Sequence, residues 1–169
     1  MRKSIITALV LMAFTGAGCT TDSTWHFPIQ FGDSEERVQA IAGMSEHSPD
    51  PTKKIHWYPQ SGFTIIYDDY KKVTEIVFPN SNNGSGWNRY EKDIFGSIDT
   101  QSTYQDFEKQ LGEPYENVHD VEFNDTQYTA KWRTDGFGVE AEFYYEDFTE
   151  NSVTYKKDAL SYLSIKKAL

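Results

Sequence analysis

Apolar residues gather in six short stretches of the chain, and in several of them they alternate with polar residues. The stretches are residues 54–58, 62–67, 73–78, 128–132, 138–143 and 160–165. Each stretch is rich in β-branched and aromatic residues and has turn-forming residues nearby, which is typical of a short strand. Alternation with a period of two also predicts that each strand turns one face toward a core.

Two further segments carry the signals of a short helix. Residues 34–43 begin with Ser34 and end with Gly43, and residues 103–112 begin with Thr103 and end with Gly112. The hydroxyl at the start caps the free amide groups, and acidic residues follow in the first turn. The closing glycine allows the left-handed turn that ends a helix.

The two halves of the chain align with each other. Residues 29–43 match residues 98–112 at a constant offset of 69, and the strand-like stretches follow in the same order. Trp57 then corresponds to Trp132, so each indole is expected to be buried against its own helix. The alignment predicts an α+β fold of two tandem helix-plus-three-strand repeats, with the helices packed on one face of antiparallel sheet.

The alignment and the composition of the chain together predict five segments. They are a signal peptide at 1–18, a tether at 19–28, the first α+β repeat at 29–79, a linker loop at 80–91 and the second α+β repeat at 92–169. The linker is rich in Asn, Ser and Gly, as flexible loops are. The second repeat contains a polar, acidic excursion at 145–158.

The first nineteen residues have the order of an export signal. Arg2 and Lys3 precede an apolar run at 5–14, and small residues at 16–18 lead to Cys19. This order predicts a lipoprotein signal with Cys19 as the acylated residue, although Gly16 stands where Leu is usual. An ordinary secretory signal cleaved nearby is the alternative. The residue after Cys19 is Thr20, whereas an Asp at this position would resemble an inner-membrane retention signal. The absence of that Asp favours the outer membrane, with the protein facing the periplasm.

The charge balance narrows the choice of partner. The chain has a net charge of −10, and residues 1–18 carry two of its positive charges, so the remainder has −12. This charge argues against nucleic acid and favours a basic protein partner. A negative net charge that only keeps the protein soluble is the alternative explanation. Cys19 is the only cysteine, so no internal disulfide is expected.

No pattern in the sequence indicates catalysis, a metal or a cofactor. The four histidines lack metal-ligand spacing, and Gly84-Ser85-Gly86 is not a nucleophile elbow because Asn83 replaces the required glycine. Glu140 and Glu142 share a strand face and could form an acid/base pair, but solvated charge is the simpler interpretation. We therefore expect a protein that is not an enzyme and has no small-molecule substrate.

Large side chains among carboxylates instead predict a protein-binding surface, because Tyr and Trp are frequent anchors of interfaces. A solvated sheet face is the alternative. The residues expected to contact a partner are Tyr58, Trp87, Tyr90, Glu140, Glu142, Tyr144, Glu146 and Asp147.

A capped short helix ending in LG-x-P, followed by three strands with a Trp in the first, carries a family resemblance. It resembles the tandem-repeat fold of beta-lactamase inhibitor proteins and is similar to small outer-membrane lipoproteins of the barrel-assembly machinery. The second half, from IDTQSTYQDFEKQLGEPYENV onward, resembles domains of toxin-immunity proteins. The resemblance implies two candidate functions: inhibition of a periplasmic toxin as an immunity protein, or scaffolding of outer-membrane assembly.

Overall fold

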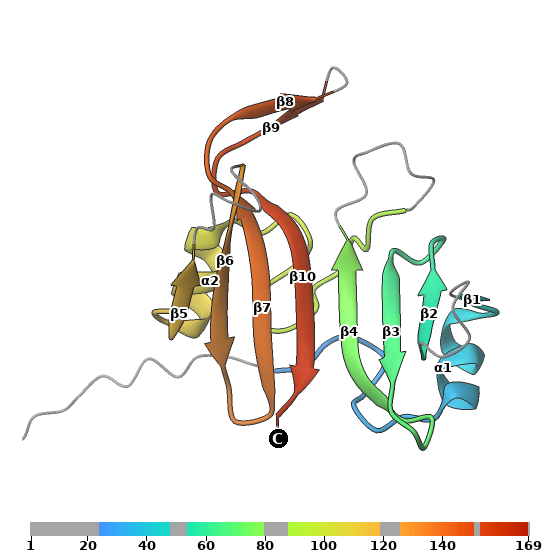
Figure 1. Cartoon of the computed structure of the whole chain (residues 1–169). Helices are drawn as coiled ribbons and strands as arrows, with labels where there is room; N and C mark the ends of the chain where they lie inside the picture. The colour runs from blue at the N-terminus through green and yellow to red at the C-terminus, as the bar shows by residue number, and fades with distance from the viewer. Residues whose placement is uncertain (1–23, 48–53, 80–87, 119–125, 151–152, 169) are drawn as a thin grey trace, which may run out of the picture.

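A computed structural model of the chain describes residues 24–47, 54–79, 88–118, 126–150 and 153–168. Most strands form one antiparallel sheet with the order β1-β2-β3-β4-β10-β7-β6-β5, and β8 pairs with β9 in a separate hairpin (Figure 1). The helices are α1 (Glu35–Ala42) and α2 (Tyr104–Leu111). The strands are β1 (Glu46–His47), β2 (Ile55–Tyr58), β3 (Phe63–Tyr67), β4 (Val73–Pro79), β5 (Glu116–Val118), β6 (Gln127–Arg133), β7 (Phe137–Tyr144), β8 (Phe148–Glu150), β9 (Val153–Tyr155) and β10 (Leu160–Lys167).

This architecture corrects the predicted fold of two helix-plus-three-strand repeats. The main sheet has eight strands and is continuous, because β4 pairs directly with β10. In the described residues, two short helices accompany it. The expected equivalence of Trp57 and Trp132 is also wrong. Trp132 faces the helices, whereas Trp57 lies between His56 and Tyr58, whose side chains face α1 and the core, so its own side chain points to the opposite face.

The two helices begin and end where the sequence predicts. Ser34 caps α1 by accepting a hydrogen bond from the Arg37 amide, and the Gly43 N–H closes the helix on the Gln39 carbonyl. At α2, Thr103 and Asp106 form a capping box, and the Gly112 N–H bonds to the Glu108 carbonyl. Gly43 and Gly112 both have positive φ, at 84° and 80°, which is the backbone region that glycine adopts without strain.

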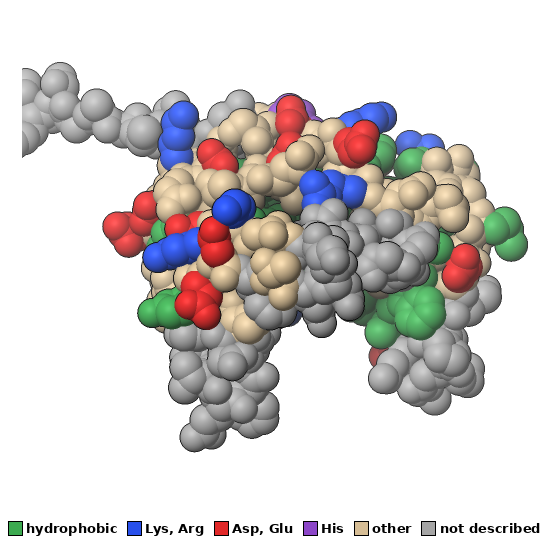
Figure 2. Space-filling view, turned by 90° about the horizontal axis from the view of Figure 1, so that it is seen from above, with side chains coloured by type: hydrophobic (Ala, Val, Ile, Leu, Met, Phe, Trp, Pro, Cys, Tyr) green, Lys and Arg blue, Asp and Glu red, His purple; other side chains and the backbone are tan. Residues whose placement is uncertain are grey.

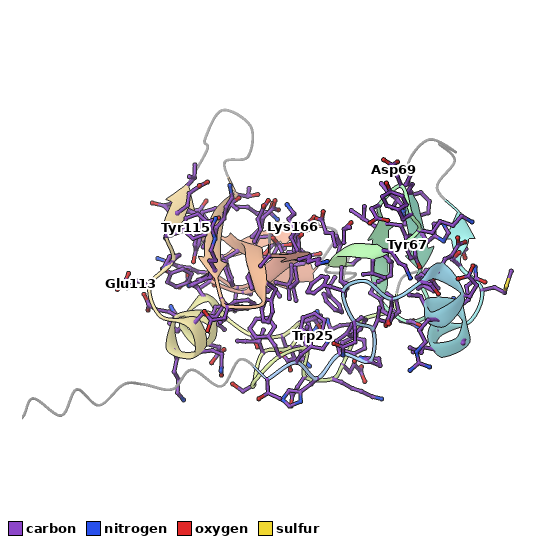
Figure 3. The ribbon with its side chains drawn as sticks, turned by 90° about the horizontal axis from the view of Figure 1, so that it is seen from below. Trp25, Tyr67, Asp69, Glu113, Tyr115 and Lys166 are labelled. Atoms are coloured by element: carbon purple, nitrogen blue, oxygen red, sulfur yellow. The ribbon has the colours of Figure 1, made fainter. Side chains whose placement is uncertain are left out.

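One continuous core lies between the sheet and the layer formed by the helices and the loops beside them (Figure 3). Each helix contributes one fully buried side chain, Val38 from α1 and Phe107 from α2. Residues 24–28, the end of the predicted tether, also belong to this layer because Phe27 is buried and Trp25 packs on Phe137. Within the described residues, no helix is long and apolar enough to cross a membrane.

Candidate functional site

The candidate site is the sheet face opposite the helices, which we call the open face. Figure 3 shows Tyr115 and Lys166 on this side of the sheet and Trp25 and both helices on the other. The strand registers align its side chains in rows that cross the sheet. The central row contains Thr64, Val77, Ser164, Glu140, Lys131 and Glu116.

A network of carboxylates and lysines occupies the centre of the open face. The Lys166 ammonium lies 3.1 Å from a Glu140 carboxylate oxygen and 3.7 Å from Glu75. The Ser164 hydroxyl donates to Glu75 over 2.6 Å, which ties β10 to β4. We call the six residues Glu75, Glu116, Lys131, Glu140, Glu142 and Lys166 the carboxylate network.

The outer part of the network lies on β5 and β6. The Lys131 ammonium is 2.6 Å from a Glu116 carboxylate oxygen. This hydrogen bond, with help from Glu140, raises the pKa of Lys131. Ion pairs of this kind at a surface contribute little to stability, about 0–1 kcal/mol, so a partner's groups can replace them at small cost.

Glu142 and Tyr162 are half-buried on the neighbouring row of the open face. Burial, together with the neighbouring charge of Glu140, raises the pKa of the Glu142 carboxyl. Burial and the charges of Glu75 and Glu140 raise the pKa of the Tyr162 hydroxyl to about 12. The face therefore holds negative charge that a nearby cation would stabilise.

The β8–β9 hairpin rises beside one end of the open face. The Tyr155 ring of the hairpin packs on Tyr144 with their centroids 4.7 Å apart, and both side chains are buried. At the base of the hairpin Asp147 pairs with Lys156 at 2.7 Å, and Glu146 is exposed. Figure 2, which views the molecule from this end, shows acidic and basic side chains interspersed over the surface.

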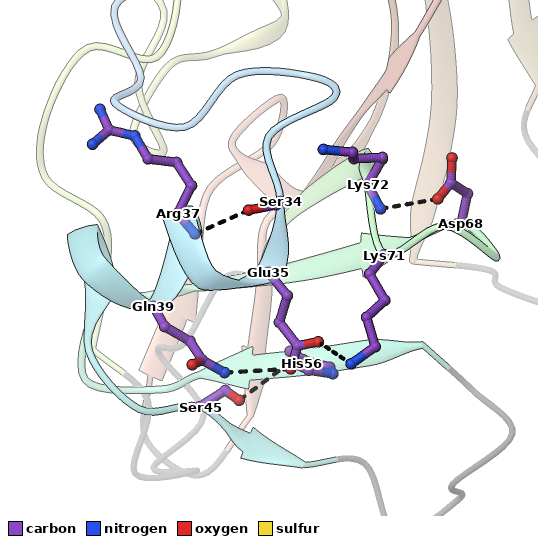
Figure 4. Close-up of polar contacts among 9 residues, drawn as sticks. All are labelled: Ser34, Glu35, Arg37, Gln39, Ser45, His56, Asp68, Lys71 and Lys72. Carbon is purple, nitrogen blue, oxygen red and sulfur yellow. Dashed lines mark hydrogen bonds and ion pairs between the residues drawn. The ribbon is translucent and has the colours of Figure 1, made fainter.

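A second polar cluster lies between α1 and the sheet (Figure 4). The Glu35 carboxylate contacts Lys71 at 3.0 Å and His56 Nδ1 at 3.7 Å, and the Ser45 hydroxyl lies 3.3 Å from the same His56 Nδ1. A catalytic Ser-His-Glu triad needs serine and carboxylate on opposite ring nitrogens. Because both groups meet Nδ1, this cluster is not arranged as a triad, and we interpret it as a link between α1 and β2.

The structure separates the predicted contact residues into groups. Glu140 and Glu142 lie half-buried on the open face, and Glu146 and Asp147 are exposed at the hairpin base. The prediction that Tyr58 contacts a partner is wrong, because Tyr58 is 2% exposed and faces the core. Tyr90 packs in the core on Phe27 and Phe78, and Tyr144 is covered by Tyr155, so neither ring is free to insert into a partner. Trp87 lies outside the described residues.

Sequence reasoning missed five members of the site: Glu75, Glu116, Lys131, Ser164 and Lys166. Glu75 and Ser164 are 89 positions apart, and only the pairing of β4 with β10 brings them together. The alternation of side chains along each strand could have assigned these residues to the open face. It could not have shown which residues of other strands lie beside them.

In the described part of the chain, no three His, Cys, Asp or Glu side chains are placed to hold a metal ion. Comparisons with known protein families, with curated proteins and with solved structures find no match. Function therefore has to be inferred from the residues of the site.

Proposed function

We propose that this protein binds and inhibits a basic protein through the open face of its sheet, as an immunity protein against a secreted bacterial toxin in the periplasm. Export and anchoring follow from the signal predicted at residues 1–18 and from acylation of Cys19, which would hold the protein at the outer membrane. The observation that carries the proposal is the carboxylate network on a sheet face that neither described helix covers.

A rigid sheet suits this role because its side chains are already in place before binding. Glu140 and Lys166 sit on paired strands, and the Glu75–Ser164 hydrogen bond fixes the neighbouring pair. Preorganised groups lose little conformational entropy on association, so more of the interaction energy appears as affinity.

The charge of the network selects the partner. Its four carboxylates outnumber its two lysines, and Glu142 carries a raised pKa because its charge is poorly solvated. A lysine or arginine from a partner would supply the missing positive charge and lower that pKa on binding. Affinity should therefore increase as the pH rises through the pKa of Glu142.

The test is co-expression in the periplasm with candidate secreted toxins from the same genome, combined with binding kinetics. The test variant is Glu140→Gln/Glu142→Gln. The matched control is Glu91→Gln/Asp135→Asn, which removes the same charge from exposed positions away from the network. We expect the test variant to associate about tenfold more slowly at low salt and to protect poorly, and the control to behave as the wild type.

Equal protection by the test variant and the control would show that the partner does not bind through the open face. Failure of the wild-type protein to protect, with no measurable binding, would contradict the immunity function itself and favour the scaffolding alternative.

A further inference from the structure

A pocket lies at the opposite side of the sheet from the carboxylate network, near the base of the β8–β9 hairpin. Its volume is about 330 Å³, which suits one small ligand or one long side chain. Its walls include three tyrosines, one carboxylate and two side-chain amides: Tyr104, Tyr128, Tyr145, Asp158, Gln105 and Asn117.

Two of the tyrosine rings form fixed walls. The Tyr104 and Tyr128 centroids are 5.7 Å apart, with their planes at 62°. Both rings also pack on Phe143, at 5.5 and 5.6 Å, and this buried side chain holds them in place. Tyr145 supplies a third ring that is 49% exposed at the mouth of the pocket.

Asp158 is held rigidly in the pocket wall. Its carboxylate accepts from the Tyr128 hydroxyl at 2.9 Å and from the Gln105 amide at 3.0 Å. Its backbone bonds to Tyr104 and Tyr144, and its φ of 61° is one that Asp and Asn tolerate better than other side chains. An ionised carboxylate has about four acceptor positions, so about two remain for a ligand.

The electrostatic surroundings favour a positive ligand. Burial first, and then the charges of Glu108 and Glu113, raise the pKa of the Tyr104 hydroxyl. Burial and the hydrogen bond to Asp158 raise the pKa of Tyr128. Lys157 also lines the pocket, but it is exposed, so water screens its positive charge.

We propose that this pocket binds an alkylammonium group, with the cation against the three tyrosine rings and beside the Asp158 carboxylate. Aromatic faces attract cations, and several faces around one carboxylate discriminate an ammonium from a neutral group of the same shape. The group belongs either to a small free molecule or to a lysine of a partner. This inference does not depend on the function proposed above, because the pocket lies away from the carboxylate network.

The experiment is NMR titration of the full chain, observed at the tyrosine ring signals. One pair of probes is choline and its neutral isostere 3,3-dimethylbutanol, and the other is Nα-acetyl-lysine amide and its Nε-acetylated form. We expect the two cations to bind with dissociation constants on the order of 1 mM and the neutral probes to bind at least tenfold more weakly. Tighter binding of choline would indicate a free ligand, and tighter binding of the lysine probe a partner's side chain.

Two variants test the site itself. Tyr145→Ala removes an exposed ring and Asp158→Asn removes the charge, and each should weaken cation binding by about five- to tenfold. Tyr70→Ala, at an exposed turn, and Asp135→Asn are the matched controls and should bind as the wild type. The proposal is overturned if neither cation binds, if the neutral isosteres bind equally well, or if binding survives in Tyr145→Ala, the variant expected to leave the fold intact.

Discussion

Replacing Trp132 with alanine tests which side of the sheet is the core, and therefore which side a partner can reach. Trp132 is 2% exposed, and its ring packs on Phe107 at 5.4 Å and on Tyr104 at 6.1 Å. Its indole N–H donates to the Gly112 carbonyl over 2.8 Å, which ties β6 to the end of α2. The chain offers its own comparison, since Trp57 lies half-buried on the open face.

The magnitude follows from these contacts. Emptying a large aromatic site costs about 3–5 kcal/mol, and loss of the hydrogen bond to Gly112 adds about 1 kcal/mol. Since a domain has a total stability of about 5–15 kcal/mol, Trp132→Ala should come close to unfolding the protein. Trp132→Phe keeps most of the apolar contact and should cost less than half as much. Trp57→Ala removes a half-buried ring and its cross-strand packing on the open face, and should cost about 1 kcal/mol.

Urea unfolding followed by far-ultraviolet circular dichroism measures all three variants, because its signal does not depend on the tryptophans that are changed. We expect similar slopes and a midpoint that falls far more for Trp132→Ala than for Trp57→Ala. Equal losses from the two alanine variants would mean that both faces are packed, and the open face would then be unavailable to a partner.

Three further predictions concern separate parts of the chain. Glu142→Gln should raise the Tm by about 1–3 °C at pH 7–8 and have no effect near pH 4. The pKa of Glu142 is raised in the folded state, so the wild-type protein loses stability as this carboxyl ionises with rising pH. Thermal unfolding at several pH values measures the difference, and a lower Tm of the variant at pH 7 would contradict the prediction. Gly62→Ala should lower the free energy of unfolding in urea by more than about 2 kcal/mol. Gly62 has a φ of 76°, and an added Cβ would lie 2.5 Å from the Tyr90 backbone nitrogen. A decrease below about 0.5 kcal/mol would refute this close approach. Cys19→Ser should abolish palmitate labelling and release the protein into the soluble periplasmic fraction, and continued labelling would exclude Cys19 as the acylated residue.

Local structure was predictable from the sequence because its causes are local. A hydroxyl side chain caps the amides of its own helix, so Ser34 and Thr103 mark the starts of α1 and α2, and Gly43 and Gly112 mark their ends. The six short stretches rich in β-branched and aromatic residues likewise mark strands β2, β3, β4, β6, β7 and β10. Each signal is contained within a few neighbouring residues.

The face that each strand presents was predicted less well, because strand side chains have a period of two. The alignment matched Trp57 to Trp132, and a register difference of a single residue is enough to exchange the core face for the open face. His56 and Tyr58 occupy the helix side in β2, which leaves Trp57 outside and buries the ring that was expected at an interface.

Only the tertiary structure decided how the strands join and which charges meet. The sequence contains nothing local that pairs β4 with β10, yet this pairing turns two halves into one sheet and brings Glu75 to Ser164 and Lys166. The tyrosine pocket likewise joins α2, β6 and the segment after β9. Such contacts depend on the burial of the whole apolar surface at once, so composition and spacing predict that carboxylates and tyrosines are present but not which of them form a site.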